Sequence, residues 1–253
     1  MSEVVIAGAG IHKFGRFGDK PYVQIGEEAV RMALSDAGMK WTDVQAMFCA
    51  SMYMPPTTGV RILERFGRTG IPVVDVEAAC AGGGACLKQA YSAVASGAYD
   101  VVLAMGVEKM PRGFMAPEAI YNSWQCRLGL SQNPLYWALN ARRHMHDYGT
   151  TEQQIAKVAV KNHRNSTLNP NAMYQKAIDL EEIMLSPMVC DPVRLLMLCA
   201  PDEGAAAAIV CTREVAKRFK CEPVTLAAVA HRTAPFPLNQ VASFCTTPTG
   251  KPP

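Results

Sequence analysis

Short apolar runs alternate with amphipathic segments over the first part of this 253-residue chain. Four of these runs predict buried strands, at 4–7, 47–50, 71–76 and 101–105. Apolar residues at helical spacing between them predict helices, at 22–38, 59–66 and 85–95. Because strands connected through helices pair in parallel by right-handed crossovers, the alternation predicts an α/β protein with parallel strands.

The alternation stops after the strand at 101–105. Between Pro111 and about Pro201 the chain carries two of its three tryptophans, several Pro and Asn turns, and helical patterns at 134–147 and 152–165. We expect this segment to be a mainly helical insertion. Further elements follow it, predicted as strands at 204–211 and 224–229, a short helix at 214–219 and a proline-rich run at 233–253.

Composition and charge exclude several classes of protein. The formal net charge is +3 and the isoelectric point is about 8.4, which is too mild for a nucleic-acid binder. No apolar run reaches the ~18 residues of a membrane span, and Met1–Lys13 has the character of a strand rather than of a signal peptide. The nine cysteines include no CxxC pair, so we expect neither a metal site nor a disulfide framework. Free cysteines are typical of reducing compartments, and we expect a cytoplasmic protein.

Cys80 lies between the predicted strand at 71–76 and the helix at 85–95, and three glycines follow at 82–84. The free N–H groups and the dipole at a helix start stabilise an anion, so a thiolate there is a better nucleophile near neutral pH. Glycines let backbone and substrate approach the sulfur. This arrangement suits attack on an acyl carbonyl and storage of the acyl group as a thioester. On this chemistry alone a small buried cysteine beside a tight turn is the commoner outcome, because free cysteines are usually inert core residues.

Several segments around and beyond Cys80 carry a family pattern. They are the turn at 76–83, the strand end Gly106-Val107-Glu108-Lys109-Met110, the strand start at 202–208, and the stretches at 142–150 and 159–163. In order and content they resemble the thiolase family, with its Cys-Ala-Ser/Thr-Gly turn, Gly-x-Glu-x-Met strand end and Asp-Gly-Ala-Ala-Ala strand start. Glu203 stands at the position of that last aspartate. The stretches at 142–150 and 159–163 look most like the sterol carrier protein X and lipid-transfer-protein-like branch. This resemblance favours Cys80 as an acyl-accepting nucleophile.

The resemblance implies a thiolase-like βαβαβαββ layer with an inserted, mainly helical loop domain. The N-terminal α/β domain would comprise 1–110 and 202–232, and the loop domain 111–201. The proline-rich 233–253 would begin a C-terminal half that lies outside this sequence. The family's usual assembly implies a homodimer, or a hetero-oligomer with a chain that supplies the second half.

The activity that the resemblance implies is acyl-CoA acyl transfer: thiolysis of a 3-oxoacyl-CoA, or Claisen condensation, through an acyl-enzyme on Cys80. Coenzyme A would be a substrate, and no bound cofactor is expected. The N–H of Cys80 would be one donor to the oxyanion. Substrate- and CoA-binding roles are implied for five residues of the loop domain, Tyr136, Trp137, Arg142, Arg143 and Cys199. By residue type alone they would be core aromatics, a solvated basic helix face and a core cysteine.

The sequence departs from the family in what its second half should supply. The histidine of the family's Gly-His-Pro-x-Gly loop activates the nucleophile, and none of the five histidines here lies in such a motif. Loss of a general base costs about 10²–10⁴-fold in rate. Two alternatives therefore stay open beside the acyltransferase: a related carbon–carbon lyase or condensing enzyme, and a non-catalytic CoA-ester-binding subunit that needs a partner.

Overall fold

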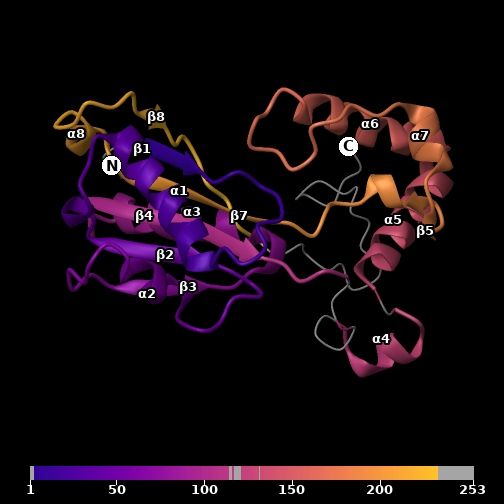
Figure 1. Cartoon of the computed structure of the whole chain (residues 1–253), viewed down its shortest axis with the longest axis horizontal. Coiled ribbons are helices and arrows are strands. Elements are labelled where there is room, and N and C mark those ends of the chain that lie inside the picture. The colour runs from indigo at the N-terminus through magenta and orange to yellow at the C-terminus, as the bar shows by residue number, and fades with distance from the viewer. Residues whose placement is uncertain (1–2, 114–115, 117–120, 131, 233–253) are drawn as a thin grey trace. The chain divides into compact units, whose positions relative to one another are not determined.

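A computed structural model describes residues 3–113, 116, 121–130 and 132–232 of the chain (Figure 1). The chain divides into two compact units, one made of Met1–Pro111 with Asp202–Arg232 and the other containing Arg112–Pro201. The proline-rich stretch at 233–253, predicted to begin a further half, lies outside the described residues. Each unit has a hydrophobic core of its own.

The first unit is built on a six-stranded sheet with the order β3-β2-β4-β7-β1-β8. Its strands are β1 (Val4–Ile11), β2 (Ala46–Ala50), β3 (Val73–Val76), β4 (Val101–Lys109), β7 (Glu203–Thr212) and β8 (Val224–Thr225). Its helices are α1 (Tyr22–Ala37), α2 (Thr58–Leu63), α3 (Gly82–Ala95) and α8 (Arg213–Ala216), with short 3₁₀ turns at Trp41–Asp43 and Ala79–Ala81. The predicted α/β class is confirmed.

Strand directions agree with the prediction in one part of the sheet and not in another. Strand β2 pairs in parallel with both β3 and β4. Strand β7 is antiparallel to β4 and to β1, and β8 is antiparallel to β1. The expectation of parallel pairing is therefore wrong for β1. The reason is that β7, which follows the inserted segment rather than a crossover helix, lies between β1 and β4 and runs the opposite way.

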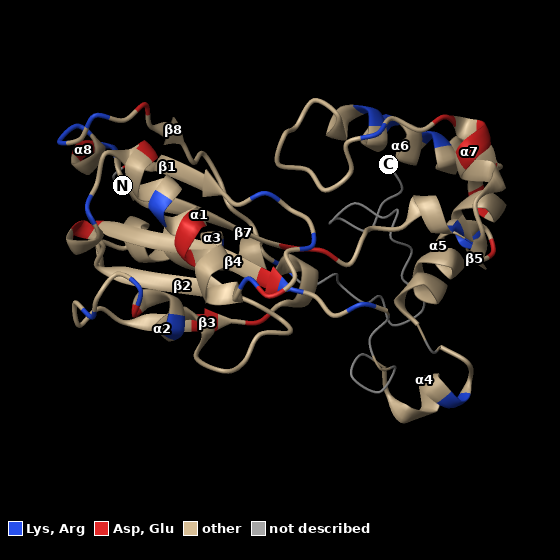
Figure 2. Cartoon of the chain, viewed as in Figure 1, with Lys and Arg blue, Asp and Glu red and all other residues tan. Residues whose placement is uncertain are grey.

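The two faces of the sheet pack against different helices. Along β2, Met47 and Cys49 belong to the core cluster with α1 and α2, whereas Ala46 and Ala50 belong to the cluster with α3. This alternation follows from the two-residue period of a strand. Figure 2 shows the consequence, because β2 has no charged residue along its length while acidic and basic residues lie on α1 and on the connecting loops. The central strands are thus buried on both faces, whereas the edge strands β3 and β8 keep exposed residues.

Strand β1 is longer than predicted because its glycines belong to the strand. A Cβ added to Gly10 would lie 2.1 Å from the carbonyl oxygen of Ala29, and one added to Gly8 would lie 2.5 Å from that of Ala33. Only glycine allows α1 to pack this closely on the strand. At the other end of the unit, the strand predicted at 224–229 is wrong in extent, since only Val224–Thr225 pairs with β1.

The second unit is mainly helical. It contains α4 (Ser123–Arg127), α5 (Asn133–Tyr148), α6 (Glu152–Ser166) and α7 (Leu180–Leu185), with a small hairpin of β5 (Met188–Cys190) and β6 (Val193–Arg194) and a 3₁₀ turn at Leu195–Met197. Thr151 caps α6 by accepting the N–H of Gln154. Its described core is small, formed by Ala156, Ile178 and Ile183. Across the described parts of both units, no helix combines the length and apolarity needed to cross a membrane.

Candidate active site

Cys80 lies in the turn that joins β3 to α3. The turn is a single 3₁₀ segment, Ala79–Ala81, and the 14-residue helix α3 begins directly after it at Gly82. The Cys80 residue is exposed. The first N–H groups of a helix have no partner within the helix, and together with the helix dipole they favour negative charge next to them. The predicted position of the cysteine at a helix start is therefore what the structure shows.

The backbone of this turn is strained just before the cysteine. Ala79 has φ of 44°, in the left-handed region that residues with a Cβ rarely occupy. The Oε1 atom of Glu77 accepts the N–H of Ala79 at 2.7 Å and helps to hold this conformation. Strain of this kind is found mainly at functional sites, where it fixes the direction of a reactive side chain.

The start of α3 is pressed against the end of β2. A Cβ added to Gly82 would lie 3.0 Å from the Cβ of Ala50, the last residue of β2. Added Cβ atoms at Gly83 and Gly84 would meet nothing within 4 Å among the described residues. The first glycine therefore permits close packing beneath Cys80, while the other two leave the surface beside the helix start open.

Two further cysteines lie in the core of this unit, one on each side of the sheet. Cys49 on β2 and Cys86 on α3 are both fully buried. Burial, and secondly the negative charge of Asp75, raises the pKa of Cys86 to about 12 and raises the pKa of Cys49 as well. Neither thiol ionises near neutral pH, so Cys80 is the reactive candidate among these three.

Glu108 connects the end of β4 to the loop that follows β2. Its carboxylate accepts the backbone N–H of Met52 at 2.8 Å and that of Tyr53 at 3.2 Å. The phenol of Tyr53 is half-buried, and burial, the Glu108 charge and the nearby Cys80 raise its pKa. Glu108 belongs to the Gly-x-Glu-x-Met pattern at the strand end. The structure therefore gives this glutamate a role in holding a loop.

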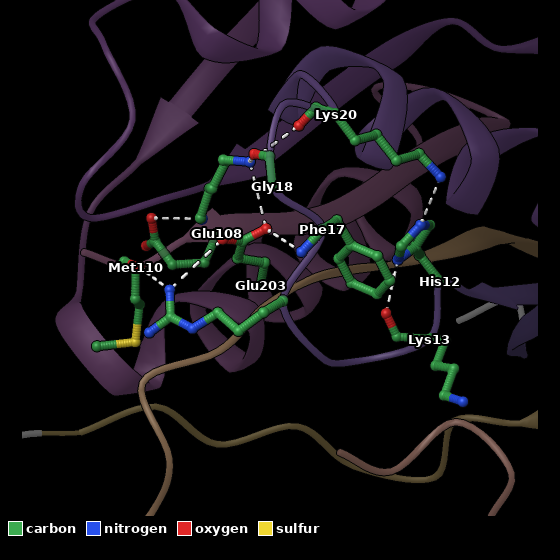
Figure 3. Close-up of polar contacts among 10 residues, drawn as sticks. His12, Lys13, Phe17, Gly18, Lys20, Glu108, Met110 and Glu203 are labelled. Atoms are coloured by element: carbon green, nitrogen blue, oxygen red, sulfur yellow. Dashed lines mark hydrogen bonds and ion pairs between the residues drawn. The ribbon is translucent and has the colours of Figure 1, made fainter. Parts of the chain in front are cut away.

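The next residue, Lys109, faces the other side of the strand end and joins a buried carboxylate. Glu203 is 5% exposed, and its Oε2 accepts the N–H of Phe17 at 2.9 Å and lies 3.3 Å from Lys109 Nζ (Figure 3). Arg16 reaches the other oxygen of Glu203 at 3.4 Å and donates to the carbonyl of Met110. Burial opposes ionisation of Glu203, but these donors outweigh it and lower the pKa of the carboxyl. The acidic residue at the family's aspartate position thus fastens the loop at 15–20 to the ends of β4 and β7.

Two buried histidines of the described chain have their partners away from Cys80. His12 Nδ1 lies 2.7 Å from the carbonyl oxygen of Lys13, and Nε2 lies 2.9 Å from Lys20 Nζ (Figure 3). Nε2 also lies 3.4 Å from Glu28 Oε2, so the His12 ring is held between the loop at 13–20 and α1. His163 is buried against the Tyr174 ring. Within the described ranges no hydrogen bond or ion pair joins a histidine to Cys80.

The other predicted site residues all lie in the second unit. Tyr136 and Trp137 on α5 make an edge-to-face contact with centroids 5.9 Å apart. Arg142 pairs with Asp191, and Arg143 pairs with Asp147 at 2.6 Å. Cys199 is exposed. Because they belong to a different unit from Cys80, their roles in binding substrate and coenzyme A stay predictions. No cluster of His, Cys, Asp and Glu that could hold a metal occurs in the described part of the chain.

Sequence reasoning missed two residues of the Cys80 region. Glu77 was seen only as part of the family pattern, and Tyr53 was not singled out. A signal existed for Glu77, since a carboxylate two residues before a turn commonly accepts a backbone N–H. No local pattern pointed to Tyr53, which enters the site only because β2 lies between β3 and β4.

Comparison with known proteins gives a consistent result. Residues 4–214 match the family described as "Thiolase, N-terminal domain". The chain is 37% identical to an acetyl-CoA acetyltransferase of Methanothermobacter thermautotrophicus over 248 residues, covering 94% of this chain and 64% of that protein. It is 34% identical to sterol carrier protein 2 of Gallus gallus, covering 87% and 43%. It is 31% identical to the benzoylsuccinyl-CoA thiolase subunit BbsB of Thauera aromatica, covering 92% and 62%.

A solved structure described as "Ltp2-ChsH2(DUF35) aldolase" has a similar fold. The TM-score is 0.75 at 29% sequence identity, and the match covers 88% of this chain and 59% of that one. In each of these comparisons the chain spans less than two thirds of the protein that it matches.

Proposed function

Because this chain belongs to the thiolase family, we propose that it contributes the nucleophilic half of an acyl-CoA acyltransferase site, with Cys80 as the acyl acceptor. The observation that carries the proposal is the exposed Cys80 in a strained turn at the start of α3, within the matched region. Acyltransferase and thiolase relatives at 31–37% identity support the same chemistry.

The proposed reaction is the one that membership of the thiolase family implies for a cysteine nucleophile. In thiolysis the Cys80 thiolate attacks the 3-carbonyl carbon of a 3-oxoacyl-CoA, and the bond between carbons 2 and 3 breaks. The acyl group stays on sulfur as a thioester, while the enolate of acetyl-CoA leaves and takes a proton. A second coenzyme A thiol then attacks the thioester, releases the shortened acyl-CoA and frees Cys80. In the condensing direction the same steps run in reverse.

We propose that the proton acceptor for Cys80 comes from a second half-site outside the described residues. Two names support an oligomer with a chain that supplies this half-site. One relative is named as a subunit, and the similar solved structure carries two components in its name. Helix-end stabilisation of a thiolate can support acylation without the base, but more slowly.

For the second unit we propose a role in substrate binding. Tyr136 and Trp137 would line the acyl and pantetheine channel, and Cys199 would lie near the pantetheine. Arg142 and Arg143 would meet phosphates of coenzyme A, exchanging the carboxylates of Asp191 and Asp147 for the ligand. A cytoplasmic location is also proposed, and the free cysteines of the described chain support it.

A carbon–carbon lyase is the second candidate. Two observations favour it: the similar solved structure is named an aldolase, and no histidine is bonded to Cys80 within the described ranges. A lyase of this kind would release an aldehyde from a hydroxyacyl-CoA without an acyl-enzyme. Aldehyde release from Cys80→Ser protein would favour this alternative.

The test of the acyltransferase proposal is the intact mass of the purified chain after mixing with an acyl-CoA. We expect a thioester adduct that is absent from the Cys80→Ser variant and that free coenzyme A discharges. Absence of the adduct in folded protein, with Cys80 still reactive toward iodoacetamide, would contradict acyl transfer by this chain alone. Restoration by a co-purified second chain would then place the chain as a partner-dependent subunit.

A further inference from the structure

The loop after β2 lies between the two functional strand ends. The sheet order β3-β2-β4 places β2 in the middle, and its pairing with both neighbours is parallel. The carboxyl ends of the three strands therefore meet at one edge of the sheet. Cys80 follows β3, Tyr53 follows β2, and Glu108 lies at the end of β4. The loop that carries Tyr53 therefore starts between the strand end that leads to the nucleophile and the strand end that carries the glutamate.

Glu108 fixes the path of this loop through two hydrogen bonds. Its carboxylate accepts the N–H groups of Met52 and Tyr53, which immediately follow β2 after Ser51. Such charge-assisted bonds to backbone are stronger than neutral ones. The strand end that carries Glu108 is itself anchored on its other face, because Lys109 bonds to the carbonyl of Lys20 and pairs with Glu203.

The start of α3 lies directly against this end of β2. Gly82 leaves only 3.0 Å between an added Cβ and the Cβ of Ala50, three residues before Tyr53. The Tyr53 ring is half-buried, and Cys80 is close enough to influence its phenol electrostatically. The phenol stays protonated, since burial, Glu108 and Cys80 all raise its pKa. A neutral ring adds no charge that would oppose a thiolate.

We propose that Glu108 holds Tyr53 beside Cys80 so that the Tyr53 ring forms one wall of the space occupied by the acyl group on the sulfur. Tyr53 is then a specificity-determining residue, and Glu108 is a positioning residue that acts through it. The inference rests on Cys80 as acyl acceptor for its biological meaning. Its geometric content, a wall next to the sulfur, holds for any reagent that reaches Cys80.

The experiment uses two series of reagents on the full chain. One series is acyl-CoAs of increasing acyl size, and the other is N-methyl-, N-cyclohexyl- and N-phenylmaleimide, which alkylate thiolates without acyl chemistry. Adducts at Cys80 are quantified after digestion, apart from other exposed cysteines such as Cys199. The quantity compared is the ratio of the rate with the small reagent to the rate with the bulky one.

Five variants separate the effect of the Tyr53 ring from the effect of the Glu108 hydrogen bonds and from a general loosening of the fold. They are Tyr53→Phe, Tyr53→Leu, Tyr53→Ala, Glu108→Gln and Glu108→Ala. We expect Tyr53→Ala to lower the ratio of the small-reagent rate to the bulky-reagent rate by about tenfold. Small changes in the width of a pocket change its discrimination by size to about that extent. Tyr53→Phe keeps the ring and should keep the ratio, while Tyr53→Leu gives an intermediate value. Glu108→Ala should also lower the ratio with Tyr53 intact, and Glu108→Gln less so, because its amide oxygen still accepts.

Tyr99→Ala is the matched control. Tyr99 is half-buried like Tyr53 but precedes β4, so it lies at the opposite end of that strand. Its removal should leave the ratio at Cys80 unchanged.

The outcomes distinguish this inference from the function on which it rests. If the rate ratio stays at the wild-type value in Tyr53→Ala and Tyr53→Leu while Cys80 still reacts, the Tyr53 ring does not limit the space next to the sulfur and the inference is wrong. A ratio that falls equally in Tyr99→Ala overturns it too, since loosening would then explain the change. Failure of every acyl-CoA to acylate wild-type Cys80, with the maleimide ratios behaving as expected, rejects the acyl-transfer proposal and supports the wall.

Discussion

The turn that carries Cys80 and the packed layer beneath it place cysteines in opposite environments. Cys80 is exposed, follows a residue with positive φ and precedes a helix. Cys49 packs in the core on the α1 and α2 side of the sheet, Cys86 packs on the α3 side, and neither has exposed surface. The layer is close-packed and tolerates little change, whereas the turn holds a strained backbone next to open space. The comparison shows that the reactive thiol and the residues that stabilise the fold lie in different regions, although the two regions are only a few residues apart in the sequence.

The largest expected difference is in thiol reactivity. At pH 8 a thiol with a pKa of about 12 is only about 10⁻⁴ ionised, so Cys86 should be alkylated at least about 10³-fold more slowly than Cys80. Time-resolved peptide mass mapping with iodoacetamide measures both rates. Raising the pH should speed Cys86 about tenfold per unit while the fold persists, because its thiolate fraction rises.

Two controls accompany this measurement. The Cys80→Ser variant should lack the adduct that forms early and should leave the slow labelling of the other cysteines unchanged. Unfolding in urea should make the alkylation rates of Cys86 and Cys49 equal, because burial no longer protects either thiol. Comparable labelling of Cys86 and Cys80 in folded protein would mean that the layer opens readily, and the contrast between the two regions would be lost.

The buried carboxylate at the strand ends should show the next largest effect. Glu203→Ala removes the partner of Lys109 and Arg16, and we expect a loss of about 3 kcal/mol in the free energy of unfolding. The matched control is Glu214→Ala, since that side chain is 74% exposed in its pair with Lys217 and should cost about 0.5 kcal/mol or less. Urea unfolding followed by circular dichroism compares them, and equal costs would contradict a structural role for Glu203.

The pH dependence of Glu203 has a definite sign. Its folded-state pKa is lowered from the ordinary 4.5, so its contribution to stability is complete above the unfolded value. That contribution is lost as the pH falls through the folded pKa. Wild-type protein should therefore lose more stability than Glu203→Gln protein between about pH 5 and pH 3. Parallel loss in both proteins would show that other carboxyl groups dominate acid unfolding.

Close packing of α1 on β1 predicts a third effect. Gly10→Ala places a methyl group 2.1 Å from the carbonyl oxygen of Ala29, and relieving that clash should cost about 1–3 kcal/mol. Gly83→Ala is the contrasting change, because its Cβ meets nothing and the site is helical, so it should stabilise by up to about 1 kcal/mol. Thermal and urea unfolding measure both changes, and a neutral Gly10→Ala would mean that α1 is free to shift.

Gly10 also illustrates what the sequence could predict and what it could not. The apolar run at 4–7 identified the strand, but the glycines that follow read as its end, because glycine is a weak strand former. Their role depends on the approach of α1, which is a tertiary property. The pairing of β1 with β7 was likewise hidden, because β7 returns from the far side of the insertion and brings residues about 200 positions apart together.

The site was predictable to the extent that it is local. The helix start, the turn and the glycines around Cys80 lie within a few consecutive residues, so the local sequence predicted a cysteine at a helix start, and the thiolase resemblance favoured it as a nucleophile. Tyr53 comes near Cys80 only because of the strand order, which the local sequence does not show. Glu108 was recognised as part of a family pattern, but its hydrogen bonds to the loop after β2 were not predicted. For residues of the second unit, such as Arg142, the sequence offered roles that the structure leaves as predictions.

The smallest effect is expected in the turn itself, and it should have the opposite sign to changes in the layer. Ala79 has φ of 44°, so Ala79→Gly removes a backbone strain of about 1 kcal/mol, partly offset by the greater freedom of glycine in the unfolded chain. We expect a net gain of a few tenths of a kcal/mol. Ala81→Gly is the matched control, because φ of −90° is ordinary there and glycine should only destabilise, by about 0.5 kcal/mol. If both changes destabilise equally, Ala79 is not strained, and the contrast between turn and layer then rests on exposure alone.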